Sequence, residues 1–152
     1  MKVSEVMTEA VVTEAADDTL ADAAAKMREQ QTGSLLIMEG DALSGIFTER
    51  DLLKSIAQGL DPKMTQVRDV MTRKPITVSP DAPLKEAAQL MGTKWIRHLP
   101  VVRSGKVVGM LSQRDLIGVF AEGLQEPETL EQLSGELVRA HRLRRIQAGD
   151  LD

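Results

Sequence analysis

Two short stretches of this 152-residue chain combine residue types that can bind a nucleotide. They are Thr48-Glu49-Arg50-Asp51 and Ser112-Gln113-Arg114-Asp115, and each follows an apolar run and opens a helical pattern. Where a strand ends and a helix begins, free backbone N–H groups and the helix dipole favour a phosphate. A carboxylate on that first turn can accept hydrogen bonds from both hydroxyls of a ribose. The arginine between them can add charge-assisted hydrogen bonds to phosphate.

The same pattern has a second interpretation that needs no ligand. A hydroxyl residue followed three positions later by an acid is close to a capping box, in which the two side chains satisfy backbone N–H groups. Such caps are common at helix starts. The spacing alone favours the cap over the nucleotide site. Both interpretations stay open, because one pair of side chains can serve both purposes.

Residue types that carry most enzyme chemistry are scarce. Cysteine and tyrosine are absent, which excludes disulfides and thiolate chemistry. The two histidines, His98 and His141, lie far apart in the sequence, which argues against a structural zinc site. No P-loop and no Gly-x-Gly-x-x-Gly motif occurs. We therefore expect no catalytic residues, no catalytic cofactor and no bound metal.

Charge and hydropathy limit the classes of partner. The formal net charge is −4, which argues against a protein whose whole surface binds nucleic acid. The N-terminus has no apolar signal core, and no apolar run approaches the length of a membrane span. We expect a cytoplasmic protein without membrane contact. Its core must be aliphatic, and we interpret Trp95, one of only three aromatic residues, as core or interface packing.

The chain contains an internal repeat. A shift of 64 residues aligns residues 3–56 with 67–120 without a gap, and 15 of the 54 pairs are identical. Average residue usage would give about three or four identities. A repeat determines the architecture, because both copies are expected to form the same elements in the same order. We expect a first repeat over 1–62, a second over 63–123, and a C-terminal helix and tail over 124–152.

Each repeat predicts the same order of elements: a strand, a helix, two strands and a second helix. Apolar residues recur at i, i+3, i+4 and i+7 in both copies of the first helix, and Pro83 suits a first-turn position. Tight turns separate the paired strands. The predicted strands are 11–13, 34–38, 43–48, 76–78, 99–103 and 107–112; the predicted helices are 19–30, 83–93, 127–147 and two that open at Glu49 and Gln113.

Together these motifs resemble the cystathionine-β-synthase (CBS) domain, taken twice. The resemblance rests on Val-Met-Thr, Leu-x-x-Ala-Ala-x-x-Met, His98-Leu99-Pro100-Val101-Val102 and Gly-h-h-Ser/Thr-x-x-Asp, where h is apolar, and it covers residues 1–122. It implies an α+β fold of two β-α-β-β-α repeats packed about a pseudo-twofold axis. It also implies a stand-alone pair, or Bateman module, of the bacterial or archaeal type, which forms a homodimer. Such a pair has a non-catalytic regulatory role.

By the same resemblance, adenosine-containing ligands bind in two clefts between the repeats. Each cleft pairs the Ser/Thr-x-x-Asp turn of one repeat with the early strand and second-strand start of the other. The first cleft would consist of Thr8, Val12, Gly33, Ser34, Ser112, Arg114 and Asp115. The second cleft would consist of Thr48, Arg50, Asp51, Thr72, Ile76, Arg97 and His98.

We expect the two clefts to differ, because Gly33-Ser34 stands where the second repeat has Arg97-His98. Arg97 and His98 favour several phosphates, so the second cleft should take the more anionic ligand. The apolar side chains Val12 and Ile76 would form a wall for a purine. His98 has an alternative interpretation as a partly buried residue at a strand start that binds a backbone carbonyl.

AMP or ATP is the ligand that we expect first, and NAD(H) second. S-adenosylmethionine and cyclic dinucleotides stay open, because all of these present an adenosine-like half. A nucleotide that prefers one state of the pair would shift the population that a partner protein meets. That partner is unknown, and the C-terminal helix is a candidate contact for it. The alternative is a structural homodimerisation module whose motif residues act only as caps.

Overall fold

The computed structural model describes residues 1–123 of the chain. The chain divides into two compact units, Met1–Leu116 and Ile117–Asp152. Both repeats lie in the first unit, apart from the end of the last helix. The helix predicted over 127–147 lies outside the described residues. Within residues 1–123, no helix has the length and apolar character that a membrane span needs.

The first repeat follows the predicted order of elements. Its elements are the 3-10 helix η1 (Val3–Glu5), β1 (Thr13–Ala15), α1 (Leu20–Glu29), β2 (Ser34–Glu39), β3 (Ala42–Thr48) and α2 (Glu49–Ala57). The hydroxyl of Thr19 accepts a hydrogen bond from the backbone N–H of Asp22, and the Asp22 carboxylate accepts one from Thr19, which caps the start of α1. The predicted helix 19–30 is therefore confirmed to within one residue at each end.

The second repeat has the same order, except that an isolated bridge replaces the counterpart of β1, and its strand β4 corresponds to the bridge at Thr8. Its elements are η2 (Val67–Asp69), β4 (Thr72–Arg73), α3 (Leu84–Lys94), β5 (His98–Arg103), β6 (Lys106–Ser112) and α4 (Gln113–Gly123). The strand predicted at 76–78 was wrong, because only an isolated bridge joins Val78 to Val101 there. The strand predicted at 11–13 begins two residues later. Pro83 was also misplaced, because its extended backbone makes it the N-cap of α3 rather than a helical residue.

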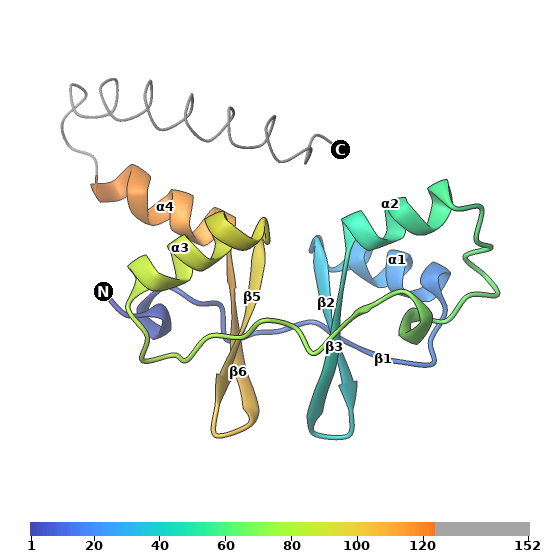
Figure 1. Ribbon diagram of the computed structural model, residues 1–152, viewed down its shortest axis with the longest axis horizontal. Coiled ribbons are helices and arrows are strands. Elements are labelled where there is room, and N and C mark those ends of the chain that lie inside the picture. The colour runs from blue at the N-terminus through green and yellow to red at the C-terminus, as the bar shows by residue number, and fades with distance from the viewer. Residues whose placement is uncertain (124–152) are drawn as a thin grey trace. The chain divides into compact units, whose positions relative to one another are not determined.

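The beginning of each repeat pairs with the hairpin of the other. Thr72 in β4 lies antiparallel to Ile46 in β3. Thr8 forms the equivalent bridge to Met110 in β6, with N–H to O distances of 2.9 Å in both directions. Figure 1 shows the two hairpins side by side, and each first segment crosses to the opposite hairpin. The two repeats therefore exchange their first segments around the pseudo-twofold arrangement.

This exchange also divides the core between the repeats. The first core consists of buried residues Ala16, Leu20, Ala23, Met27, Leu35, Ile37 and Phe47 of the first repeat and Val67 and Met71 of the second. The second core consists of Ala87, Met91, Leu99, Val101, Leu111 and Leu116 together with Val3 of the first repeat. Complete burial of a valine stabilises a fold by about 1.5–3 kcal/mol. Each repeat thus completes the core of the other.

The methionine of each Val-Met-Thr motif packs on a glycine in the opposite hairpin. A Cβ on Gly45 would stand 2.6 Å from Sδ of Met71, and one on Gly109 would stand 2.7 Å from Sδ of Met7. These distances are too short for any side chain at either position. The Val-Met-Thr motif and the glycine of the Gly-h-h-Ser/Thr motif therefore form one packing contact that joins the repeats.

Candidate nucleotide-binding cleft

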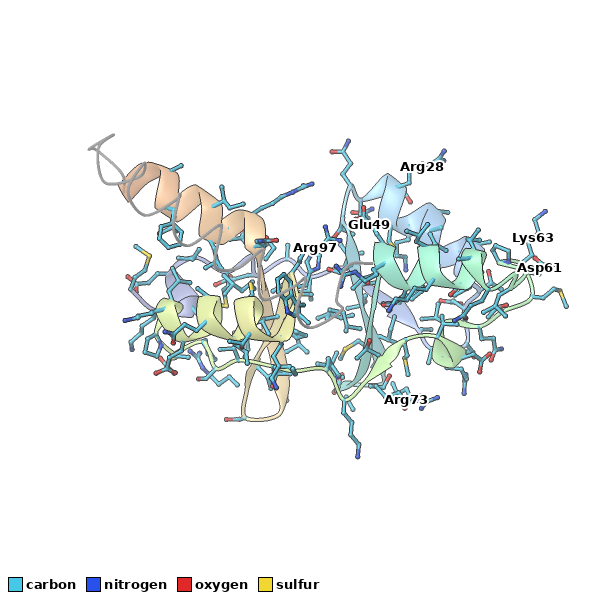
Figure 2. The ribbon with its side chains drawn as sticks, turned by 45° about the horizontal axis from the view of Figure 1, so that its top comes forward. Arg28, Glu49, Asp61, Lys63, Arg73 and Arg97 are labelled. Carbon is cyan, nitrogen blue, oxygen red and sulfur yellow. The ribbon has the colours of Figure 1, made fainter. Side chains whose placement is uncertain are left out.

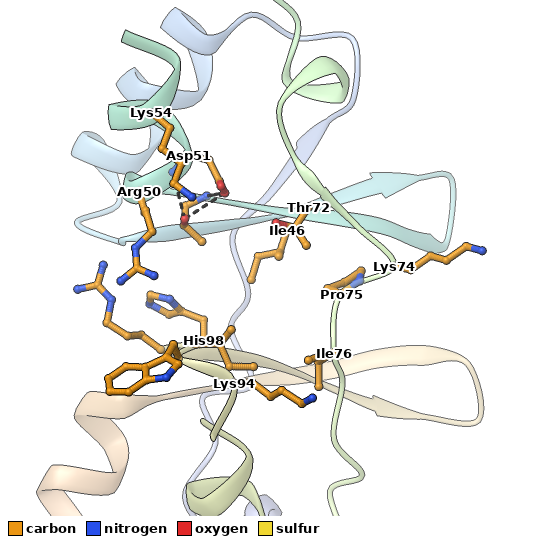
Figure 3. Close-up of a pocket in the computed structure, with 14 residues that line it drawn as sticks. Ile46, Arg50, Asp51, Lys54, Thr72, Lys74, Pro75, Ile76, Lys94 and His98 are labelled. Atoms are coloured by element: carbon orange, nitrogen blue, oxygen red, sulfur yellow. Dashed lines mark hydrogen bonds between the residues drawn. The ribbon is translucent and has the colours of Figure 1, made fainter. Parts of the chain in front are cut away.

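A pocket of about 320 Å³ lies between the two repeats, which falls in the usual range for small-molecule sites. The structure brings together in it all seven residues predicted for the second cleft: Thr48, Arg50, Asp51, Thr72, Ile76, Arg97 and His98. In Figure 3, Arg50 and Asp51 on α2 face His98 on β5 across the pocket, and Thr72 and Ile76 lie along one side. The pocket depends on the exchange of first segments, because Thr72 and Ile76 reach it from the second repeat.

The start of α2 forms the predicted cap. The Asp51 Oδ2 atom accepts hydrogen bonds from the Thr48 backbone N–H at 2.9 Å and from the Thr48 hydroxyl at 3.0 Å. The Asp51 N–H donates to the Thr48 hydroxyl at 3.4 Å. Within the described residues both hydrogen bonds to the carboxylate use Oδ2, so Oδ1 remains an acceptor for a ligand hydroxyl. The cap and a nucleotide site are geometrically compatible.

Cationic side chains dominate the polar lining of this pocket. Arg50, Arg97 and three lysines line it, whereas Asp51 is the one carboxylate among its lining residues. Low-dielectric walls lined by one sign of charge concentrate ions of the opposite sign. In Figure 3 the side chain of Lys74 extends away from the pocket, so its charge acts from the rim. The pocket is therefore suited to an anion that carries more than one charge.

Half of the residues that line the pocket were not predicted from the sequence. The additional residues are Ile46, Lys54, Lys74, Pro75, Lys94, Trp95 and Ile96. Lys54 could have been found, because it follows Arg50 by four positions and so lies on the same face of α2. Lys94 ends α3 only three residues before Arg97, but no pattern in the sequence shows whether this last residue of the helix lies on the side of the pocket.

Trp95 has a different environment from the one that we predicted. It is half-buried and lines the pocket. Its backbone is left-handed, with φ 56° and ψ 35°, and it forms the C-cap of α3. Glycine or asparagine usually occupies such a position, because other side chains pay a steric penalty there. The core-packing alternative was therefore wrong, because the side chain is only half-buried, whereas packing at an interface stays a prediction.

Burial is the main electrostatic influence on His98. It lowers the pKa of the imidazole below 6.5, and the neighbouring Arg97 guanidinium lowers it further. The free protein therefore holds His98 neutral at pH 7. A bound phosphate would oppose both effects, because it would supply negative charge beside the ring.

The residues predicted for the first cleft lie in two groups. Asp115 caps α4, with Oδ2 accepting from the Ser112 N–H and hydroxyl at 2.7 Å each. Thr8 pairs with Met110 of β6, which precedes Ser112 by two residues. On the first repeat, Val12 packs against the first core and Ser34 is buried at the start of β2.

The remaining two residues of the first cleft are Arg114 and Gly33, and the surroundings of Gly33 show how this cleft differs from the second. Arg114 is exposed on α4. Gly33 has the carboxylate of Glu49 over it, where a Cβ would stand 3.1 Å from Oε2. The first cleft thus has a carboxylate at the position that corresponds to Arg97. Among residues 1–123, no group of three or more His, Asp or Glu side chains could hold a metal ion.

The family model of the CBS domain matches residues 3–58 and 67–122. The chain belongs to the CBS-domain family. It is 43% identical over 124 residues to the CBS domain-containing protein CBSX3, mitochondrial, of Arabidopsis thaliana. That alignment covers 78% of this chain but only 59% of the Arabidopsis protein, so the chain spans less than two thirds of that relative.

Solved structures of other CBS pairs share the fold. A protein with CBS domains from Burkholderia ambifaria superposes with a TM-score of 0.79 at 32% identity, over 83% of this chain and 98% of that one. The CBS domain protein PAE2072 of Pyrobaculum aerophilum, complexed with AMP, has a TM-score of 0.72 at 27% identity, over 89% and 99%. The CBS domain pair of MJ0100, complexed with 5′-methylthioadenosine and S-adenosyl-L-methionine, has a TM-score of 0.74 at 26% identity, over 81% and 98%.

Proposed function

We propose that this CBS pair is a non-catalytic regulatory module that binds an adenosine-containing nucleotide in the second cleft. The observation that carries the proposal is the convergence of Thr48 and Asp51 from one repeat with Arg97 and His98 from the other in one pocket. Because the two sides belong to different repeats, a ligand that contacts both would stabilise one arrangement of the pair. A partner protein would respond to that shift in population.

AMP or ATP is the ligand class that the charges favour. Two CBS pairs of the same fold hold adenosine-containing molecules, AMP in one and 5′-methylthioadenosine with S-adenosyl-L-methionine in the other. Arg50 and Arg97 can bind phosphate oxygens, and guanidinium groups suit this geometry. The S-adenosylmethionine sulfonium is a cation, which a pocket lined by several cations disfavours. NAD(H), with two phosphates, is the second candidate.

The proposal can be tested by calorimetric titration of AMP, ATP, NAD and NADH into the wild type and Asp51→Ala. The substitution removes the free carboxylate oxygen that would bind the ribose, and binding should weaken at least tenfold. It also removes a cap, which costs about 1 kcal/mol of stability. Asp22→Ala is the matched control, because Asp22 forms the same cap at the start of α1 but does not line the pocket.

Equal binding by the two variants would show that Asp51 acts only as a cap. Weaker binding by Asp51→Ala alone would assign the ribose contact to it. Asp115→Ala makes the same comparison for the first cleft, since Asp115 caps α4 in the same way. Saturable binding that both Asp51→Ala and Asp115→Ala retain would show that neither carboxylate binds the ribose.

A second candidate function, homodimerisation, is favoured by the outer face of α2. Leu53 and Ile56 on this helix are 69% and 50% exposed. The repeat places Ile117 and Phe120 at the same positions of α4, and they are 60% and 62% exposed. Isolated apolar residues on a surface are ordinary, but their recurrence at both equivalent positions indicates a contact. We propose that a second copy of the chain covers them.

Sedimentation velocity of the wild type, Leu53→Glu and Phe120→Glu tests this second proposal. Both positions are exposed, so neither change should unfold the protein, and thermal unfolding checks this. A dimer that either glutamate dissociates would support the contact. A wild type that sediments as a monomer at micromolar concentration would refute it.

A further inference from the structure

Glu49 lies between the two clefts and contacts residues of both. Its Oε2 atom is 3.9 Å from Nη2 of Arg97, which lines the second cleft. The same oxygen lies over Gly33 of the first cleft, 3.1 Å from the position that a Cβ would occupy. Figure 2 shows Glu49 on α2 and Arg97 beside it from the other repeat. Glu49 itself is not among the residues that line the second cleft.

The internal repeat shows that this carboxylate is not required by the fold. Gln113 occupies the equivalent position at the start of α4, and its backbone N–H donates to the carbonyl of Arg97. In the same way the Glu49 N–H donates to the carbonyl of Gly33 at 3.1 Å. The local backbone is therefore built alike with a neutral or a charged side chain. The negative charge of Glu49 is a feature of one side only.

Within the described residues, Glu49 is the carboxylate paired with Arg97. Any anion that binds Arg97 must compete with this carboxylate and approach it. The cost of that approach rises with the charge of the ligand, because Coulomb repulsion is proportional to charge. Burial and then Arg97 lower the pKa of the neighbouring His98, and the negative charge of Glu49 partly opposes that shift. The negative charge of Glu49 thus acts on both Arg97 and His98, the two residues of the second repeat that are candidates to bind phosphate.

We propose that Glu49 is a specificity-determining residue, an internal competitor that makes the second cleft discriminate among ligands by charge. This inference rests on the proposed function, because it concerns the same pocket. Without Glu49, the cluster of cations would favour the most highly charged anion. With Glu49, part of that advantage is cancelled, and a triphosphate loses more than a monophosphate. The neutral nucleoside is unaffected.

The test is a titration of ATP, AMP and adenosine into the wild type and Glu49→Gln, which copies the residue of the second repeat. The Glu49–Arg97 pair is exposed, and pairs of this kind contribute up to about 1 kcal/mol, or fivefold in affinity. We expect Glu49→Gln to tighten ATP binding about fivefold, to tighten AMP binding about twofold, and to leave adenosine binding unchanged. Higher salt should reduce the gain.

Two further variants separate a local effect from a general one. Glu39→Gln removes the same charge at the far end of β2, about 16 Å along the strand from Ser34, and should alter no affinity. In an Arg97→Gln background, Glu49→Gln should lose most of its effect on ATP, because the competition for Arg97 no longer exists. Equal gains for all three ligands, or a Glu39→Gln effect of the same size, would overturn the inference.

Inorganic tripolyphosphate separates failure of this inference from failure of the proposed function. If no adenosine-containing ligand binds the wild type, the proposed function fails, and tripolyphosphate still reports on the anion site. Tighter tripolyphosphate binding by Glu49→Gln than by the wild type would support the role of Glu49. Equal affinity, or no binding to either protein, would overturn it.

Discussion

The first repeat contains a buried ion pair that the second repeat replaces with apolar residues. Glu14 in β1 is 7% exposed, and its carboxylate lies 3.0 Å from the ammonium of Lys26. Lys26 also donates to the carbonyl of Thr13 at 3.0 Å. Val78 and Leu90 stand at the two equivalent positions, 64 residues later, and pack against the second core. The same pair of positions is thus charged in the first repeat and apolar in the second.

We predict that copying the second repeat into the first will not destabilise the protein, whereas breaking the pair will. Loss of one partner from a buried pair costs about 3–5 kcal/mol. Because the side chain of Lys26 is 38% exposed, we expect about 2 kcal/mol for Lys26→Leu alone. The double variant Glu14→Val/Lys26→Leu should match the wild type or exceed it by up to about 2 kcal/mol, because it removes two desolvation costs together.

Urea unfolding of the wild type, both single variants and the double variant measures these differences. With a slope of about 2 kcal/mol per molar urea for a domain of this size, Lys26→Leu should lower the midpoint by about 1 M. The pairwise coupling follows from the four free energies. If Lys26→Leu changes stability by less than about 0.5 kcal/mol, or if the double variant is less stable than either single variant, the reasoning is wrong.

We also predict how the stability of these four proteins depends on pH, and the sign follows from the pKa of Glu14. Burial, and then a hydrogen bond with Asp18, raises the pKa of Glu14 above 4.5. The folded protein therefore holds this proton more tightly than the unfolded chain, so protonation of Glu14 stabilises the fold. Its contribution grows as pH falls from 7 through the folded-state pKa and is complete below the unfolded value. The penalty of Lys26→Leu should shrink over that range.

Two other predictions follow from the packing and from the site. Gly45→Ala and Gly109→Ala should each lower the free energy of unfolding by about 2–3 kcal/mol, since the new Cβ would overlap a methionine sulfur and the carbonyl oxygen of Thr72 or Thr8. Gly92→Ala is the control, because a Cβ there meets nothing within 4 Å. Equal stability of all three variants in urea unfolding would contradict the prediction. Burial and Arg97 lower the pKa of His98 in the free protein. A bound phosphate should raise this pKa, because it places negative charge beside the imidazole. The advantage of the wild type over His98→Gln in AMP binding should therefore grow as pH falls from 8 to 6. The phosphate of AMP itself titrates with a pKa of about 6 in both proteins, and calorimetry that shows a pH-independent difference between them would exclude proton uptake by His98.

The repeat and the element order were accessible from patterns in the sequence itself. The 64-residue shift and the apolar spacing are local patterns, and local patterns determine where helices and strands form. The capping pairs Thr48–Asp51 and Ser112–Asp115 were also local, because each closes within one helical turn. The family resemblance, rather than spacing, predicted which segments of opposite repeats would meet.

Only the tertiary structure decided how the two repeats complete each other. Val3 and Val67 look like ordinary apolar residues near the starts of two repeats, yet each is fully buried in the opposite core. Contacts between residues so far apart in the sequence leave no periodic trace in it. The position of Glu49 beside Arg97 and Gly33 likewise required the tertiary structure, because packing brings together segments that no local pattern connects.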